Sequence, residues 1–124
     1  MKKINVKQGK RYTFKTHVNE VLLPREEAEI MEAFRVIIDP GNCTHARSHP
    51  DTEQLYYVIS GMGKAVFTFP NGTSQEFEIL PQDLVHVPRN TQHQIFCAGE
   101  DEPLTYLCVD GFPHGIPKSE PTWN

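Results

Sequence analysis

The chain has 124 residues, of which 38% are hydrophobic and 23% are charged. This length supports one domain with a single modest core, and the composition is typical of a folded globular protein rather than a disordered one. Twelve lysines and arginines against sixteen aspartates and glutamates give a net charge of −4, so nucleic acid is not an expected partner. No apolar run approaches the roughly 20 residues that a membrane helix needs, so no membrane partner is expected.

The first 32 residues predict a peripheral arm. Residues 11–18 are compatible with one strand, and residues 23–29 predict one helical turn beginning at Pro24, because proline suits the first helical position. The lysines at the start are followed by no apolar stretch, so no signal peptide is expected. Three widely spaced cysteines do not predict a disulfide framework and favour a reducing compartment, so we expect a cytoplasmic protein.

From residue 33 onward, short apolar runs alternate with proline and glycine turns, at intervals of about 8–12 residues. No helix-length segment lies between them, so the pattern predicts an antiparallel sandwich or small barrel. Asn71 and Gly72 lie between two of the runs and predict a hairpin with a type I′ turn. The expected strands cover residues 33–39, 43–49, 53–60, 64–69, 74–80, 84–87, 91–97 and 104–110, and a proline-containing tail follows over residues 111–124.

The expected strand over residues 43–49 has an unusual face. Side chains alternate along a strand, so His45, Arg47 and His49 would share one face, together with Cys43. A plain hydrophobic core does not need such a polar set. We therefore expect side chains from this strand to converge inside a barrel with polar side chains that follow it, and the candidates are His45 or Arg47, His49, Gln54 and His93.

Two segments of the chain resemble the two motifs of the cupin family. Residues 41–61, GNCTHARSHPDTEQLYYVISG, resemble the first motif, which runs glycine, five residues, His-x-His, three or four residues, glutamate, six residues, glycine. Residues 81–97, PQDLVHVPRNTQHQIFC, resemble the second: glycine, five residues, Pro-x-Gly, two residues, histidine, three residues, asparagine. The resemblance implies an all-β fold, an antiparallel double-stranded β-helix or jelly-roll barrel, over residues 33–110.

Several motif positions depart from the family pattern. Arg47 stands at the first histidine position and Gln54 at the glutamate position, whereas His49 and His93 match. The two glycines of the second motif are replaced, one of them by Asn90, which tolerates the left-handed conformation.

The resemblance implies a centre for one divalent transition metal, and imidazole suits Fe, Ni, Zn, Mn and Cu alike. The candidate metal ligands are His49, Gln54, His93 and His45. The competing interpretation is that these residues are hydrogen-bonded polar groups in a wet barrel mouth without a metal.

Arg47 cannot bind a metal because a guanidinium has no free lone pair. Three roles remain open for it. In the first, Arg47 replaces a metal ligand and His45 supplies a metal-binding nitrogen in its place. In the second, Arg47 binds an anionic group of a ligand. In the third, Arg47 forms a structural ion pair with Asp51 or Glu53. Tyr56 shares a face with Gln54 and is a second candidate for contact with a substrate.

Two functions fit these features. The first is a small metal-binding cupin that acts on a small anionic molecule, such as a carboxylate or sugar acid, as an isomerase, lyase or dioxygenase. No catalytic residue is assigned, and whether the chain is an enzyme stays open. The alternative is a non-catalytic binding or sensor cupin with a degenerate metal site. The resemblance also implies a homodimer, in which the arm of residues 1–32 is added to the sheet of a second copy, since unpaired edge strands favour association.

Overall fold

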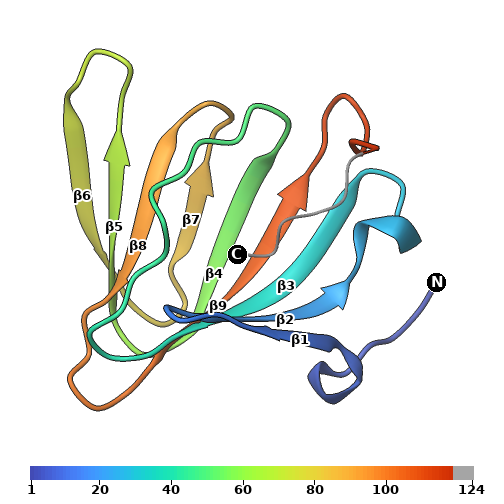
Figure 1. The fold of residues 1–124 in the computed structure, drawn as a ribbon, viewed down its shortest axis with the longest axis horizontal. Helices are drawn as coiled ribbons and strands as arrows, with labels where there is room; N and C mark the ends of the chain where they lie inside the picture. The colour runs from blue at the N-terminus through green and yellow to red at the C-terminus, as the bar shows by residue number, and fades with distance from the viewer. Residues whose placement is uncertain (119–124) are drawn as a thin grey trace.

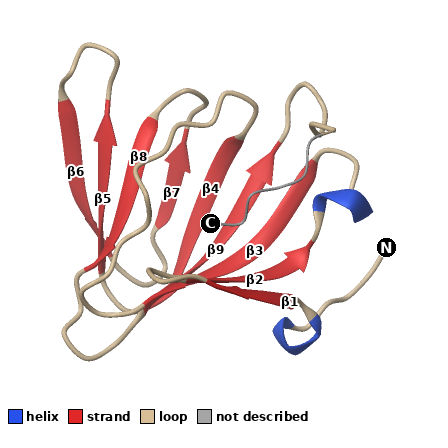
Figure 2. Ribbon diagram, viewed as in Figure 1, coloured by secondary structure: helices blue, strands red, loops and turns tan. Residues whose placement is uncertain are grey.

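The computed structural model describes residues 1–118, in which two antiparallel β-sheets face one another (Figure 1). The larger sheet has the strand order β1-β2-β3-β9-β4-β7, and the smaller has the order β6-β5-β8. The strands of this part of the chain are β1 (Lys10–Thr13), β2 (Val18–Leu23), β3 (Met31–Ile38), β4 (Glu53–Ser60), β5 (Gly63–Thr68), β6 (Ser74–Ile79), β7 (Leu84–Val87), β8 (Gln92–Cys97) and β9 (Leu104–Gly111). Helical structure in the described chain is limited to two short 3-10 turns, η1 (Val6–Gln8) and η2 (Arg25–Glu27) (Figure 2).

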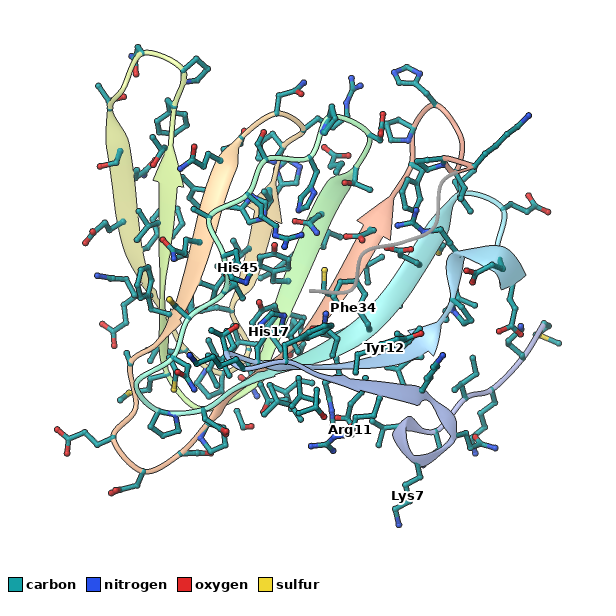
Figure 3. All side chains as sticks on the ribbon, in the orientation of Figure 1. Lys7, Arg11, Tyr12, His17, Phe34 and His45 are labelled. Atoms are coloured by element: carbon teal, nitrogen blue, oxygen red, sulfur yellow. The ribbon has the colours of Figure 1, made fainter. Side chains whose placement is uncertain are left out.

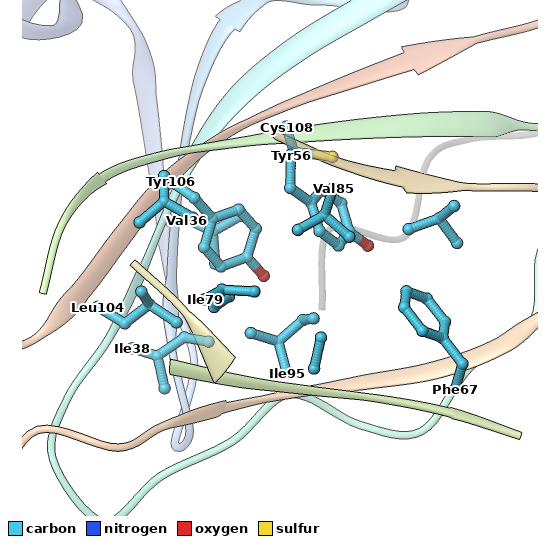
Figure 4. Packing of buried hydrophobic residues seen from close by; sticks show 13 residues of the cluster. Val36, Ile38, Tyr56, Phe67, Ile79, Val85, Ile95, Leu104, Tyr106 and Cys108 are labelled. Atoms are coloured by element: carbon cyan, nitrogen blue, oxygen red, sulfur yellow. The ribbon is translucent and has the colours of Figure 1, made fainter. Parts of the chain in front are cut away.

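The core lies between the sheets and follows the two-residue period of the strands. In β9, every second residue from Leu104 to Asp110 is buried and the residues between them are half-buried. Tyr56 and Tyr106 extend from the larger sheet toward the smaller one, with ring centroids 4.9 Å apart (Figure 4). The predicted all-β antiparallel architecture is therefore confirmed.

The strand predictions are wrong in two places. Residues 11–18 form the end of one strand, a turn and the start of another, so β1 and β2 make a hairpin whose second strand pairs with β3. Residues 43–49 do not form a strand, because their backbone pairing with β8 is limited to two isolated bridges, Cys43 to Phe96 and Arg47 to His93. Between the bridges, Thr44 is bonded to Gln94 and Ile95 through side-chain hydrogen bonds. This interrupted pairing does not impose a regular pleat, and side chains of the segment do not alternate strictly between two faces. Exchange of the arm with a second copy stays a prediction.

The turns explain how the chain accommodates the two replaced glycines of the second motif. Gln82 has φ 76° and Asn90 has φ 62°, the positive values found for non-glycine residues of the described chain. Both therefore adopt the backbone conformation that glycine favours. The hairpin between β5 and β6 is confirmed, but its loop spans residues 69–73 and only Gly72 has positive φ, so the type I′ prediction is wrong.

We expect Gly61→Ala to destabilise the fold strongly. Gly61 has φ +82°, and a Cβ there would lie 2.2 Å from the carbonyl oxygen of Pro103. The strained conformation costs about 1–2 kcal/mol, and the backbone clash adds to that cost. Gly41→Ala is the control, because Gly41 has φ +84° with nothing near its Cβ position. Urea denaturation should show a clearly larger loss for Gly61→Ala; equal losses would contradict the role of the clash.

Among the described residues, no helix is long and apolar enough to cross a membrane.

Candidate functional site

A cavity of about 370 Å³ lies between the sheets. Its walls come from β3, β4, β8 and β9, from the segment that precedes β4, and from the N-terminal hairpin. Every candidate site residue from the sequence lines this one cavity, namely His45, Arg47, His49, Gln54, Tyr56 and His93. The convergence expected from the motif spacing is thus present, although the segment of residues 43–49 is not a strand.

His49 and His93 are neighbours on the cavity wall, with ring centroids 5.2 Å apart. Two imidazoles that share an ion, with nitrogen–metal distances of about 2.0–2.1 Å and angles of about 90–110°, have centroids about 4.5–5.3 Å apart. The spacing of this pair therefore fits a shared ion. Within residues 1–118, however, no third histidine, cysteine, aspartate or glutamate joins such a cluster, so any further protein ligand has to be an amide or hydroxyl.

The orientation of the His93 ring is fixed by its backbone surroundings. Its Nδ1 lies 2.9 Å from the carbonyl oxygen of Thr91, which can only accept a hydrogen bond. Nδ1 therefore carries a hydrogen, and in the neutral ring Nε2 carries the lone pair. Burial lowers the pKa of His93, and the charge of Arg47 lowers it further, against the opposing effect of the Thr91 carbonyl. A neutral imidazole oriented in this way through its second nitrogen is the form that binds metals.

The pKa of His49 is lowered from its ordinary value of 6.5 to about 4, by burial first and then by His93 and Arg47. We expect the His49 ring signals in an NMR titration of metal-free protein to change with a midpoint near pH 4. Because the unfolded chain binds this proton more readily, the contribution of His49 to stability is present above pH 6.5 and is lost as the pH falls toward 4. A midpoint near 6.5 would contradict this environment.

Gln54 is buried, and both ends of its amide are hydrogen-bonded. Its Nε2 donates to Oδ1 of Asp110 at 2.7 Å, and its Oε1 accepts from the hydroxyl of Tyr56 at 2.7 Å. An amide oxygen has two lone pairs, so Oε1 retains acceptor capacity after binding Tyr56. Tyr56 is itself 4% exposed, with its ring 6.2 Å from that of His93.

Arg47 faces the cavity and has a charged side chain without a counter-ion. In the part of the chain that the structure describes, its guanidinium forms no ion pair or hydrogen bond, so a structural pair with Asp51 or Glu53 is not present. Glu53 points away from the cavity and bonds His86 at 2.8 Å. His45 lies in the exposed part of the same wall.

Further polar residues of the cavity lie outside the two motifs, among them Glu32, Asp110, His17 and Arg25, and sequence reasoning missed them. Glu32 and Asp110 are acids that are 2% and 6% exposed, and His17 is 6% exposed. Arg25 pairs with Glu32 at 2.6 Å. His17, in the turn between β1 and β2, lines the cavity together with His45 from the segment before β4, and both are labelled in Figure 3. The alternation of side chains along a strand could have predicted that Asp110 faces inward, because Asp110 lies on the same face of β9 as Cys108 and Tyr106.

The comparisons with known proteins agree with this arrangement. The family model for the Cupin domain matches residues 34–110 of the chain. Auxin-binding protein T85 of Nicotiana tabacum is 35% identical over an 89-residue alignment that covers 67% of this chain and 46% of that protein. The chain therefore spans about half the length of this curated relative.

Two solved structures share the fold at low sequence identity. Oxalate decarboxylase of Lactobacillus farciminis, in a formate complex, has a TM-score of 0.77 and 24% identity, over 90% of this chain and 34% of that one. Oxalate decarboxylase of Bacillus subtilis, which has Mn(II) centers, has a TM-score of 0.78 and 20% identity, over 91% and 31% of the two chains.

Proposed function

Because this chain belongs to the cupin family, we propose that its cavity binds a small carboxylate or similar anion beside a divalent metal ion. His49 and His93 would hold the ion, with Oε1 of Gln54 as the third protein ligand. When bound, such an ion polarises a carbonyl or carboxylate oxygen as a Lewis acid. The likeness to oxalate decarboxylases, one of which has Mn(II) centers and another of which binds formate, supports this combination.

The observation that carries the proposal is the unpaired Arg47 beside two imidazoles of lowered pKa. A guanidinium in a partly buried site is costly unless an anion compensates it. Arg47 also lowers the pKa of His17, His49 and His93, so all three rings favour the neutral form, which does not repel a metal cation. A carboxylate would pair with the guanidinium through two parallel hydrogen bonds.

The chain's own residues define what the site does to such a ligand. Arg47 binds and orients the anionic end, and the aromatic rings of Phe34, Tyr56 and Tyr106 exclude water from the rest of the cavity. Inward acids were not expected from the motifs, yet Glu32 and Asp110 are present on the opposite wall. Since Glu32 is already bonded by Arg25, these acids do not take the place of the anion at Arg47.

The test is Arg47→His, measured by titration calorimetry with Zn²⁺ and separately with formate and oxalate. We expect this change to tighten Zn²⁺ binding, because it restores an imidazole at the ligand position, and to weaken carboxylate binding at least about tenfold. Arg89→Ala is the control, because Arg89 is exposed and outside the cavity. If Arg47→His leaves both affinities unchanged, the assigned role of Arg47 is wrong.

A second candidate function is a binding module that captures the anion without a metal. It is favoured by one observation, namely that both ends of the Gln54 amide are already bonded and no third acidic or imidazole ligand joins His49 and His93 among residues 1–118. Metal analysis of protein purified without chelators separates the two candidates. Stoichiometric metal supports the first, and carboxylate binding by metal-free protein supports the second.

A further inference from the structure

A chain of buried hydrogen bonds crosses the larger sheet at one level of the cavity. Glu32 of β3, Asp110 of β9 and Gln54 of β4 are direct cross-strand partners in the antiparallel register. Arg25 donates to Glu32 at 2.6 and 3.2 Å, the carboxyl groups of the cross-strand partners Glu32 and Asp110 lie within hydrogen-bond reach of each other, and Asp110 accepts from Gln54 at 2.7 Å. The chain ends at Tyr56, whose hydroxyl donates to Gln54 at 2.7 Å.

This chain of hydrogen bonds has only one possible direction. A guanidinium only donates, so both oxygens of Glu32 accept from Arg25. Glu32 and Asp110 can bond each other only if one proton lies between their carboxyl groups. Asp110 then presents an acceptor to Gln54, which leaves the amide oxygen on the side of the Tyr56 hydroxyl.

The burial of these groups makes the opposite orientation unfavourable. Glu32, Asp110, Gln54 and Tyr56 are 2%, 6%, 5% and 4% exposed, so water offers little compensation for a lost bond. A flipped Gln54 amide would set its oxygen against the acceptor oxygen of Asp110. Two buried groups would then lose their hydrogen bonds together.

We propose that Asp110, held in place by Glu32 and Arg25, is a positioning residue that fixes the amide of Gln54 with its oxygen available to the metal. This inference rests on the proposed metal site, because it assigns a role to Gln54 that only a bound ion would use. Asp110 itself does not touch the ion or the ligand in this proposal. It acts through Gln54, as residues that orient metal ligands from behind commonly do.

Two substitutions at Asp110 separate positioning from charge. In Asp110→Asn, the side-chain oxygen still accepts from Gln54 and the amide nitrogen donates to Glu32, so the direction of the chain is kept. Asp110→Leu keeps the same number and branching of side-chain heavy atoms and, like asparagine, is uncharged, but it accepts nothing. We expect Zn²⁺ affinity to stay within about threefold of wild type in Asp110→Asn and to fall about 10–100-fold in Asp110→Leu.

The same Asp110→Leu substitution in a Gln54→Ala background completes a double-mutant cycle. If Asp110 acts through Gln54, its substitution should change Zn²⁺ affinity less than twofold once Gln54 is absent. An equal loss of affinity in both backgrounds would overturn the inference and leave the proposed metal site standing. If wild-type protein binds no Zn²⁺, or binds it equally without His93, the proposed function fails and the inference fails with it.

A measurement on the wild-type chain covers the case in which Asp110→Leu does not fold. Zn²⁺ is diamagnetic, so the side-chain amide protons of Gln54 can be followed by ¹⁵N NMR in metal-free and Zn²⁺-loaded protein. We expect one of these protons to exchange slowly with solvent in both states, because its bond to Asp110 is kept. Loss of that protection on loading would mean that the ion binds a differently oriented amide, which contradicts the inference.

Discussion

Replacing His93 with alanine is expected to remove metal binding almost completely. His93 is 5% exposed, its Nδ1 is committed to the Thr91 carbonyl, and its Nε2 is the nitrogen left to face His49. Loss of a residue behind a ligand costs about 10–100-fold in metal affinity, so loss of the ligand itself should cost more than 100-fold. Metal content after purification and calorimetry with Zn²⁺ would both report the change.

His86→Ala is the matched control for this experiment. His86 is an exposed histidine that bonds Glu53 on the outer face of β4 and β7, away from the cavity. The His86→Ala substitution removes the same kind of side chain as His93→Ala, but it should leave Zn²⁺ affinity unchanged. If His93→Ala and His86→Ala retain metal equally well, the ion is not bound in the cavity.

Replacing Arg25 with methionine is expected to destabilise the protein by about 3–5 kcal/mol, the range for removing one partner of a buried ion pair. The side chains of Arg25 and Glu32 are 14% and 2% exposed, and the guanidinium also lies 5.0 Å from the centre of the Phe112 ring. Without Arg25, the Glu32 carboxylate would remain buried beside a second acid, Asp110. Urea denaturation at neutral pH measures this loss.

The surface pair Lys2 and Glu27 provides the comparison. These side chains are 40% and 53% exposed at a similar distance of 2.7 Å, so Lys2→Met should change stability by no more than about 0.5 kcal/mol. Adding Glu32→Gln to Arg25→Met should recover part of the loss, because it removes the uncompensated charge. Equal, small effects of Arg25→Met and Lys2→Met would show that Glu32 is solvated or paired by another group.

The sequence was sufficient to predict most strands and the position of the site. The observed limits of β4 and β7 match the predicted ones. Proline and glycine turns flank both strands, and such turns interrupt the strand pattern directly. The segment of residues 43–49 was predicted wrongly because its alternation looks like a strand, whereas strand formation also requires a continuous partner. Its two bridges to β8 are a tertiary property that no local pattern contains.

The acidic side of the cavity was not predictable from the motifs. Glu32 and Asp110 lie before and after the two motifs, and Asp110 is the last residue of the expected strand over residues 104–110. Only the register of β3, β9 and β4 places these acids beside Gln54. Arg47, by contrast, could be named as a candidate from the family spacing, which sets it two residues before His49, and it lines the cavity; the sequence left its role open.

The place of β9 in the larger sheet determines when the site can form. This last strand lies between β3 and β4, which precede it in the chain by dozens of residues. A ribosome-bound chain that has not yet released residues 104–111 therefore cannot close the sheet, and contacts of such long range form slowly. We expect the cavity to be assembled only after residues 104–111 have left the ribosome, with its buried polar groups exposed to water until β9 is inserted.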